Sequence, residues 1–122
     1  MSNAATQAYA RVANTSATPR ELEAQALLMA ANKLQEVATN AALPPEQRMH
    51  ALMFNRKLWS VFLGDALSEG NLQPLEVRQK IVDISIFVLT QTLVLQNHPQ
   101  IDEFKSLIEI NRNIAAGLSG RA

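Results

Sequence analysis

Three proline-marked breaks constrain this chain more than any other feature of its sequence. They fall at Leu43-Pro44-Pro45, at residues 69–74 and at Asn97-His98-Pro99. Proline disfavours helical geometry in the residue before it, and glycine and asparagine favour turns. The stretches between the breaks carry apolar residues at the three- and four-residue spacing of a helix, and none alternates like a strand. The breaks therefore predict four helices, at about residues 19–39, 45–68, 74–97 and 100–116.

The first predicted helix has the clearest start signal. Thr18 is a candidate N-cap, Pro19 falls at the first helical position, and Glu21 is placed to complete a capping box. Many of the apolar residues that follow are small, which lets neighbouring helices approach closely. The apolar positions of this helix include Leu22, Ala26, Met29, Ala30, Leu34 and Val37, and the small ones among them are the alanines. At the end of the fourth helix, Gly117 is expected to act as the terminating glycine.

The third segment is the most ambiguous one. Its centre, IVDISIFVLTQTLVL at residues 81–95, is rich in β-branched residues, so a strand is the competing prediction. Its length and its lack of turn residues favour a helix. Asp83 is its only charged residue. Because a helix that is apolar nearly all round is typically buried, this helix is expected to be the most buried of the four.

Four helices with short connections predict an all-α fold, namely an antiparallel up-down four-helix bundle. The bundle is expected at residues 18–118, after an N-terminal flap and hinge at 1–17, helical or extended, and before a disordered tail at 119–122. The 122 residues suit one domain, and the absence of Cys excludes a disulfide or a thiolate metal site. The sequence has neither a signal peptide nor an apolar stretch of membrane-spanning length, so a cytoplasmic protein is expected.

The sequence offers little of the chemistry that catalysis requires. It has no glycine-rich phosphate loop, and its carboxylates are spread as on solvated helix faces. His50 and His98 lack metal-ligand spacing and are expected to be ordinary surface or boundary residues. Lys and Arg together number 11, as do Asp and Glu, and zero net charge disfavours binding to a phosphate backbone. We therefore expect no enzyme, no catalytic residue, no cofactor and no metal.

Two short motifs place an asparagine on an apolar helix stripe with an arginine after it. Asn55 and Arg56 precede Trp59 in the second helix, and Asn111 and Arg112 lie in the fourth. One interpretation is that both asparagines are hydrogen-bonded inside the bundle and fix the helix register. The other is that they bind the backbone of a partner segment. Trp59 is either a core residue or a platform for that partner.

Four segments of the chain, taken together, resemble the FlaF family of flagellar biosynthesis regulators. They are AYARVANTSATPRELEAQALL, FNRKLWSVFL, VRQKIVDISIFVL and LIEINRNIAAGL, and the resemblance covers residues 8–118. The first segment is also similar to the opening of the FliS family of flagellin export chaperones, through Ala8-Tyr9, Asn14-Thr15 and the helix start at Thr18-Pro19. Beyond that opening the chain shows no convincing match to these chaperones.

The resemblance implies a role in flagellum assembly, for which three kinds of protein come into question: a chaperone, a post-transcriptional regulator and a plain structural adaptor. A flagellin-binding chaperone or regulator would promote flagellin synthesis and secretion by holding the C-terminal or another terminal segment of flagellin in a groove between helices. A post-transcriptional regulator would act on flagellin mRNA, directly or through the partner regulator FlbT. The zero net charge and the lack of an RNA-binding motif favour the first. Tyr9 and Val12 are then expected to form a flap over the groove until flagellin displaces them.

The candidates for partner binding therefore come from the flap and from the two asparagine motifs. They are Tyr9, Val12, Asn55, Arg56, Trp59, Asn111 and Arg112. No direct contact with nucleic acid and no insertion into a membrane is expected.

Overall fold

The computed structural model describes residues 19–40 and 42–120, of which 84% are helical. The helices are α2 (Pro19–Thr39), α3 (Pro45–Leu67), α4 (Leu75–Asn97) and α5 (Ile101–Leu118). Over these residues there is no strand, so helix is the correct interpretation of the ambiguous third segment. The all-α prediction is confirmed. Tyr9, Val12 and Thr18 lie outside the described residues, so the flap and the N-cap stay predictions.

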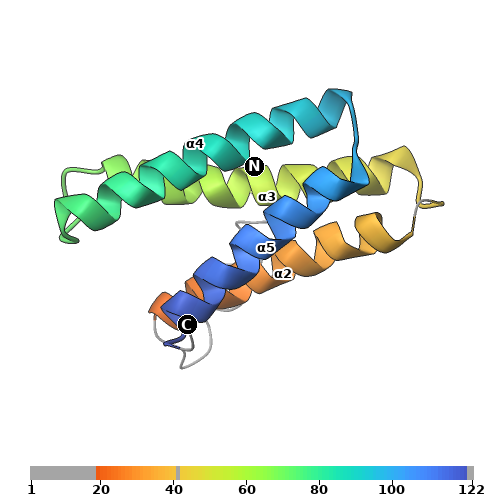
Figure 1. The fold of residues 1–122 in the computed structure, drawn as a ribbon. Coiled ribbons are helices and arrows are strands. Elements are labelled where there is room, and N and C mark those ends of the chain that lie inside the picture. Colours follow the sequence, from red (N-terminus) through yellow and green to blue (C-terminus); the bar gives the residue numbers. More distant parts are fainter. Residues whose placement is uncertain (1–18, 41, 121–122) are drawn as a thin grey trace.

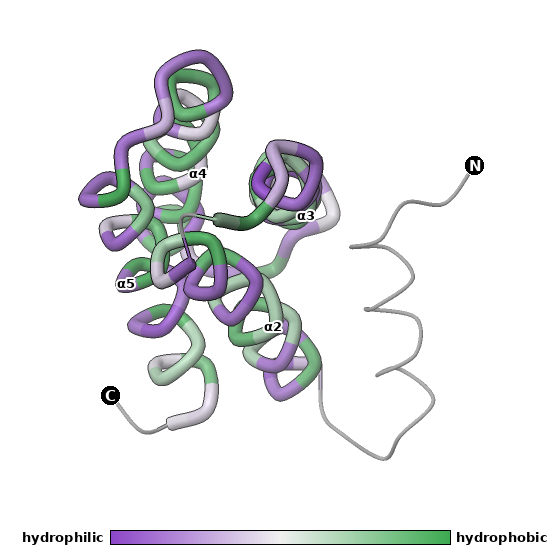
Figure 2. The backbone as a smooth tube through the Cα atoms, turned by 90° about the vertical axis from the view of Figure 1, so that its right-hand side faces the viewer, coloured by the Kyte–Doolittle hydropathy of each residue, from purple (hydrophilic) through white to green (hydrophobic). Residues whose placement is uncertain are grey.

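The four helices pack as two antiparallel pairs (Figure 1). α2 lies against α5, α3 lies against α4, and α2 also packs on α3. Seen from the side, α3 and α4 form one layer and α2 and α5 the other (Figure 2). Among these neighbours α4 and α5 touch least, and the two pairs diverge toward the end where α4 begins and α5 ends (Figure 1). The predicted up-down bundle is therefore confirmed, with one end splayed.

The core lies where α2, α3 and α5 meet. Ala26, Ala30 and Ala31 on α2 are buried, and these small side chains allow the close approach to α5 that the sequence predicts. The largest fully buried apolar side chains come from all four helices: Trp59, Phe104, Leu27, Leu34, Leu52, Leu58, Leu95, Leu107 and Val88. Fully burying one Leu, Val or Phe stabilises a fold by roughly 1.5–3 kcal/mol, so this cluster dominates the stability of the bundle.

Helix α4 is the least buried of the four, and the prediction that it would be the most buried is wrong. Only Ser85, Val88, Thr92 and Leu95 are buried, at the spacing of one narrow seam. Large apolar side chains stay exposed on either side of it: Leu75, Val77, Ile86, Phe87, Leu93 and Val94. The prediction failed because apolar residues all round a helix indicate that it requires cover. They do not indicate that the other helices of the same polypeptide bury all of its faces.

The seam of α4 has polar groups that are satisfied within the helix. Ser85 Oγ donates a hydrogen bond to the carbonyl oxygen of Ile81 at 2.6 Å, and Thr92 Oγ1 donates to that of Val88 at 2.7 Å. Such bonds to the preceding turn remove the penalty of burying a hydroxyl. The small side chains can therefore face α3, and both flanks of α4 stay open.

The end of α5 differs slightly from the prediction. Gly117 lies inside the helix, which continues to Leu118, and the residue with left-handed backbone is Gly120 at φ 72°. Leu118 packs against the core cluster, and this contact extends the helix past Gly117. Ser119 and Gly120, expected in a disordered tail, form a turn in which the Ser119 N–H donates to the carbonyl oxygen of Ala115 at 3.0 Å.

Candidate functional site

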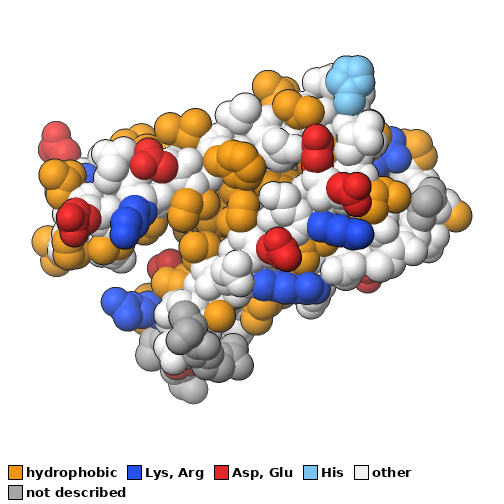
Figure 3. Space-filling model, in the orientation of Figure 1, with side chains coloured by type: hydrophobic (Ala, Val, Ile, Leu, Met, Phe, Trp, Pro, Cys, Tyr) orange, Lys and Arg blue, Asp and Glu red, His pale blue; other side chains and the backbone are white. Residues whose placement is uncertain are grey.

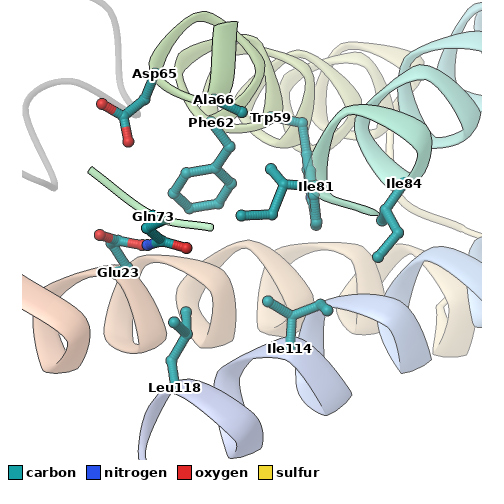
Figure 4. Close-up of a pocket in the computed structure, with 10 residues that line it drawn as sticks. All are labelled: Glu23, Trp59, Phe62, Asp65, Ala66, Gln73, Ile81, Ile84, Ile114 and Leu118. Atoms are coloured by element: carbon teal, nitrogen blue, oxygen red, sulfur yellow. The ribbon is translucent and has the colours of Figure 1, made fainter. Parts of the chain in front are cut away.

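An apolar cleft lies between the two helix pairs at the splayed end of the bundle (Figure 4). All four helices contribute to it, with α3 and α4 on one side and α2 and α5 on the other. It is lined by Glu23, Trp59, Phe62, Asp65, Ala66, Gln73, Ile81, Ile84, Ile114 and Leu118. Its free volume of about 60 Å³ is small, so the cleft as it stands suits the end of one side chain.

Beside the cleft lies a wider hollow on the surface between α4 and α5. The hollow has a volume of about 390 Å³ and is lined by Asp83, Ile84, Phe87, Ile110, Asn113 and Ile114. Ile84 and Ile114 line both spaces, so the cleft and the hollow are adjacent, and we call the two together the groove. Apolar side chains gather in the space between these two helices (Figure 3). The groove exists because α4 and α5 barely touch.

Trp59 is a core residue that also lines the cleft. Its side chain is 2% exposed, and its ring meets the ring of Phe62 edge to face, with centroids 5.3 Å apart and an interplanar angle of 87°. This is the preferred geometry of an aromatic pair and contributes about 0.5–1.5 kcal/mol beyond the area buried. The pair therefore forms a rigid apolar wall for the cleft.

A buried chain of hydrogen bonds holds Trp59 in place. Its Nε1–H donates to Oδ1 of Asn111 at 2.9 Å. Asn111 Nδ2 in turn donates to Oδ1 of Asn55 at 2.7 Å and to the carbonyl oxygen of Leu27 at 3.4 Å. Both asparagines are 0% exposed, so the prediction that they are buried and hydrogen-bonded to the protein is confirmed.

The indole of Trp59 sets the direction of the hydrogen bonds in this network. An indole N–H only donates, so the amide oxygen of Asn111 must face it and the amide nitrogen must face Asn55. Asn55 then accepts with its oxygen, and its own Nδ2 is buried without a hydrogen-bond partner among residues 19–40 and 42–120. Asn111 is therefore the central member of the network, with bonds to three groups, and Asn55 is its end.

The structure separates the arginines of the two motifs from the asparagines. Arg56 and Arg112 are exposed, and Nη2 of Arg112 donates to Oε1 of Gln35 at 3.4 Å. Asn55, Asn111 and Trp59 thus come together inside the bundle, and the two arginines lie outside it. Whether the seven candidate residues bind a partner stays a prediction, which for Tyr9 and Val12 concerns residues that the structure does not describe.

Two carboxylates stand at the mouth of the cleft, Glu23 of α2 on one side and Asp65 of α3 on the other (Figure 4). Burial raises the pKa of Glu23 above its ordinary value of 4.5, the charge of Asp65 raises it further, and Arg20 acts in the opposite direction. Within the described part of the chain, no basic side chain forms a salt bridge with either carboxylate. The mouth therefore carries two carboxylates that no salt bridge within this part of the chain neutralises.

Sequence reasoning missed most of the groove. Its isoleucines, Phe87 and the two carboxylates come from different helices, and only the splayed packing brings them together. Helical periodicity places residues on one helix and says nothing of how two helices diverge. The one signal in the sequence was the surplus of apolar residues on α4, which exceeds what a single seam needs.

Other kinds of site are not visible in residues 19–40 and 42–120. That part of the chain has no group of three or more His, Asp and Glu residues that could hold a metal ion. His50 and His98 are both exposed. None of the four helices is long and apolar enough to cross a membrane. The groove, with its apolar walls and acidic mouth, is the feature best suited to bind another molecule.

A family model described as "Flagellar protein FlaF" matches residues 5–118, which is nearly the whole chain. The resemblance drawn from the four sequence segments is therefore confirmed. No curated protein and no solved structure matches the chain.

Proposed function

The chain belongs to the flagellar protein FlaF family, and on this premise we propose that it is a non-enzymatic chaperone or regulator that binds flagellin during flagellum assembly. The ligand is a terminal segment of flagellin, with the C-terminal segment as the first candidate. The observation that supports this function is the apolar groove that the bundle leaves open between α4 and α5.

The shape of the groove suits an amphipathic helix. Ile84 and Phe87 line it from α4, and Ile110 and Ile114 line it from α5. Each pair is three or four residues apart, so each presents a short apolar stripe along its helix. A third helix that lays its own stripe between them would complete the packing that the splayed bundle lacks. Flagellin held in this way would keep its apolar stripe covered until export.

Specific binding requires that the apolar area covered in the groove outweighs the cost of ordering the bound segment. Fully burying one large apolar side chain contributes roughly 1.5–3 kcal/mol, and a segment that folds on binding must first offset the entropy of ordering its backbone. Several anchors along the groove are therefore needed. Phe87 is 49% exposed and has the most to gain from cover, because it lies at the surface of the groove.

The alternative is post-transcriptional regulation of flagellin mRNA, directly or through FlbT. Direct binding would require a cluster of Lys and Arg, because phosphate contacts dominate affinity for nucleic acids. The chain has zero net charge, and basic and acidic side chains are interspersed on the face that carries the groove (Figure 3). These features favour flagellin over RNA as the direct ligand.

The experiment that separates the two mechanisms is size-exclusion chromatography of the protein mixed with monomeric flagellin, with and without ribonuclease. We expect a complex that elutes ahead of both proteins and survives the nuclease. Flagellin that lacks its C-terminal segment is the control and should elute alone. A complex that disappears with ribonuclease, or no complex with full-length flagellin, would contradict the proposed function.

A further inference from the structure

The mouth of the cleft places two carboxylates beside an apolar interior. Glu23 is half-buried, Asp65 is exposed, and both line the same cleft as Trp59 and Phe62. The one salt bridge within residues 19–40 and 42–120 joins Lys105 to Asp102, at the opposite end of the bundle. Within this part of the chain, neither carboxylate at the mouth takes part in a salt bridge.

We propose that the cleft selects a partner segment in which a lysine or arginine accompanies the apolar residue that enters it, with the cation held between Glu23 and Asp65. This inference rests on the proposed function and specifies the chemistry of the segment that the groove binds. The cation and the apolar anchor would lie three or four residues apart on one face of the bound helix.

Charge complementarity is the first reason for this assignment. Burial raises the pKa of Glu23 because it removes part of the water around the ionised carboxylate, and the neighbouring Asp65 raises it further because it adds a like charge. Arg20 lies on the same helix and only partly opposes this effect. A cation between the two carboxylates would form a pair with each of them, and a neutral segment would cover the charges without compensating them.

The dimensions of the two spaces are the second reason. The cleft has room for the end of one side chain, at about 60 Å³, whereas the hollow beside it offers about 390 Å³ for the body of a helix. An anchor that enters the cleft from the hollow passes Ile84 and Ile114, and a cation on the adjoining turn would extend along the cleft to reach Glu23 and Asp65 (Figure 4). Lysine and arginine suit this position, because their apolar stems lie along apolar walls and their charged ends reach polar groups.

The same arrangement would disfavour acidic segments. A carboxylate next to the anchor would stand beside Glu23 and Asp65, and like charges brought together on binding weaken a complex. The mouth would thus contribute to the choice of partner by attraction and by repulsion.

The test uses two synthetic amphipathic peptides that lack Trp and carry the same leucine stripe. One has Lys and the other Gln at the position four residues after the central leucine. Binding is followed by the fluorescence of Trp59, which is the only Trp of the chain and lines the cleft. We expect the Lys peptide to bind about fivefold more tightly, the scale of one partly exposed charge pair, and added salt to reduce the difference.

Variants then assign the preference to residues. In the double variant Glu23→Gln/Asp65→Asn the two peptides should bind about equally, within roughly twofold. Glu36→Gln is the matched control, because Glu36 is an exposed carboxylate on the same helix and does not line the groove. It should keep the full preference. Both substitutions at the mouth replace a carboxylate by a neutral group of the same shape, so the fold should persist, which circular dichroism checks.

Each other outcome has a distinct meaning. Equal binding of both peptides to the wild-type protein, or a Lys preference that survives in the double variant, overturns the charge inference and leaves flagellin binding in place. If neither peptide binds, the groove is not a docking site and the inference is also overturned. Chromatography with flagellin then decides separately whether the proposed function stands.

Discussion

Trp59 links the core to the groove at the scale of single residues. Its ring lines the cleft, and its N–H is fixed by Asn111 in the interior. Spacing on the helices was enough to predict that Asn55 and Asn111 are buried. It did not predict that they bond to each other and to Trp59, because the three residues lie on two helices whose relative rotation depends on packing throughout the bundle.

The two asparagines should differ in their effect on stability. Asn111→Leu leaves the Trp59 N–H and the Asn55 oxygen without partners, so we expect a loss of about 1–3 kcal/mol in the free energy of unfolding. Asn55→Leu should cost clearly less, because Asn55 Nδ2 is already unpaired and Asn111 keeps two of its bonds. Urea unfolding followed by circular dichroism measures both. An equal or larger loss for Asn55→Leu would contradict the described network.

Glu23 should make stability depend on pH in a defined direction. Its pKa is raised in the folded state, so the folded protein holds this proton more tightly than the unfolded chain does. This contribution to stability is complete below the ordinary pKa of 4.5 and is lost as the pH rises through the raised value. Glu23→Gln removes the dependence.

The measurement is the difference in the free energy of unfolding between Glu23→Gln and the wild type at several pH values. The stability of the variant relative to the wild type should increase as the pH rises from 4.5 and then level off. A difference that is constant with pH would show that Glu23 is not desolvated.

At the scale of the helices, sequence reasoning succeeded for boundaries and failed for exposure. The prolines and turn residues between the segments act locally, so they predicted where α3 and α4 begin and end. The cover of α4 depends on its neighbours, and α5 packs on α2 rather than on α4. Ile86 and Phe87 of α4 therefore remain at the surface, although their hydrophobicity indicated a buried helix.

The attachment of α4 by one seam should be visible in its dynamics. We expect backbone amides in the middle of α4 to exchange with deuterium faster than those in the middle of α2, because α2 packs on both α3 and α5 and buries more side chains. Hydrogen-exchange mass spectrometry of the free protein measures this. Slower exchange in α4 than in α2 would mean that α4 is held more firmly than its contacts indicate.

On the scale of the whole molecule, four helices in sequence order and alternating direction were predictable from the pattern of breaks. The divergence of the two pairs was not, because it arises from the sizes of side chains on several helices at once. The groove is the result of that divergence. Its acidic mouth includes Glu23, which lies close to the start of α2 and hence close in sequence to residues 1–17.

Removing the predicted flap should strengthen binding. Tyr9 and Val12 would contribute about 2–4 kcal/mol if fully buried, and ordering about ten residues costs at least as much, so a flap would close only weakly. A protein that starts at Thr15 should bind a flagellin C-terminal peptide up to about tenfold more tightly. Clearly weaker binding by the shortened protein would instead make the segment part of the binding site.

The central claim is that flagellin binds in the groove between α4 and α5, and two neighbouring residues test it most directly. Phe87 and Ile86 are 49% and 53% exposed on the same helix, but only Phe87 lines the groove, because successive residues point about 100° apart around a helix. Either change to Asp should leave the fold intact, since exposed positions usually shift stability by less than about 0.5 kcal/mol.

The measurement is a calorimetric titration of a flagellin C-terminal peptide into the wild-type protein, Phe87→Asp and Ile86→Asp. We expect Phe87→Asp to weaken binding by about tenfold or more, because the charge would stand where an apolar anchor is covered. Ile86→Asp should bind as the wild type does. Equal affinities for all three proteins, or a loss confined to Ile86→Asp, would contradict a binding site in this groove.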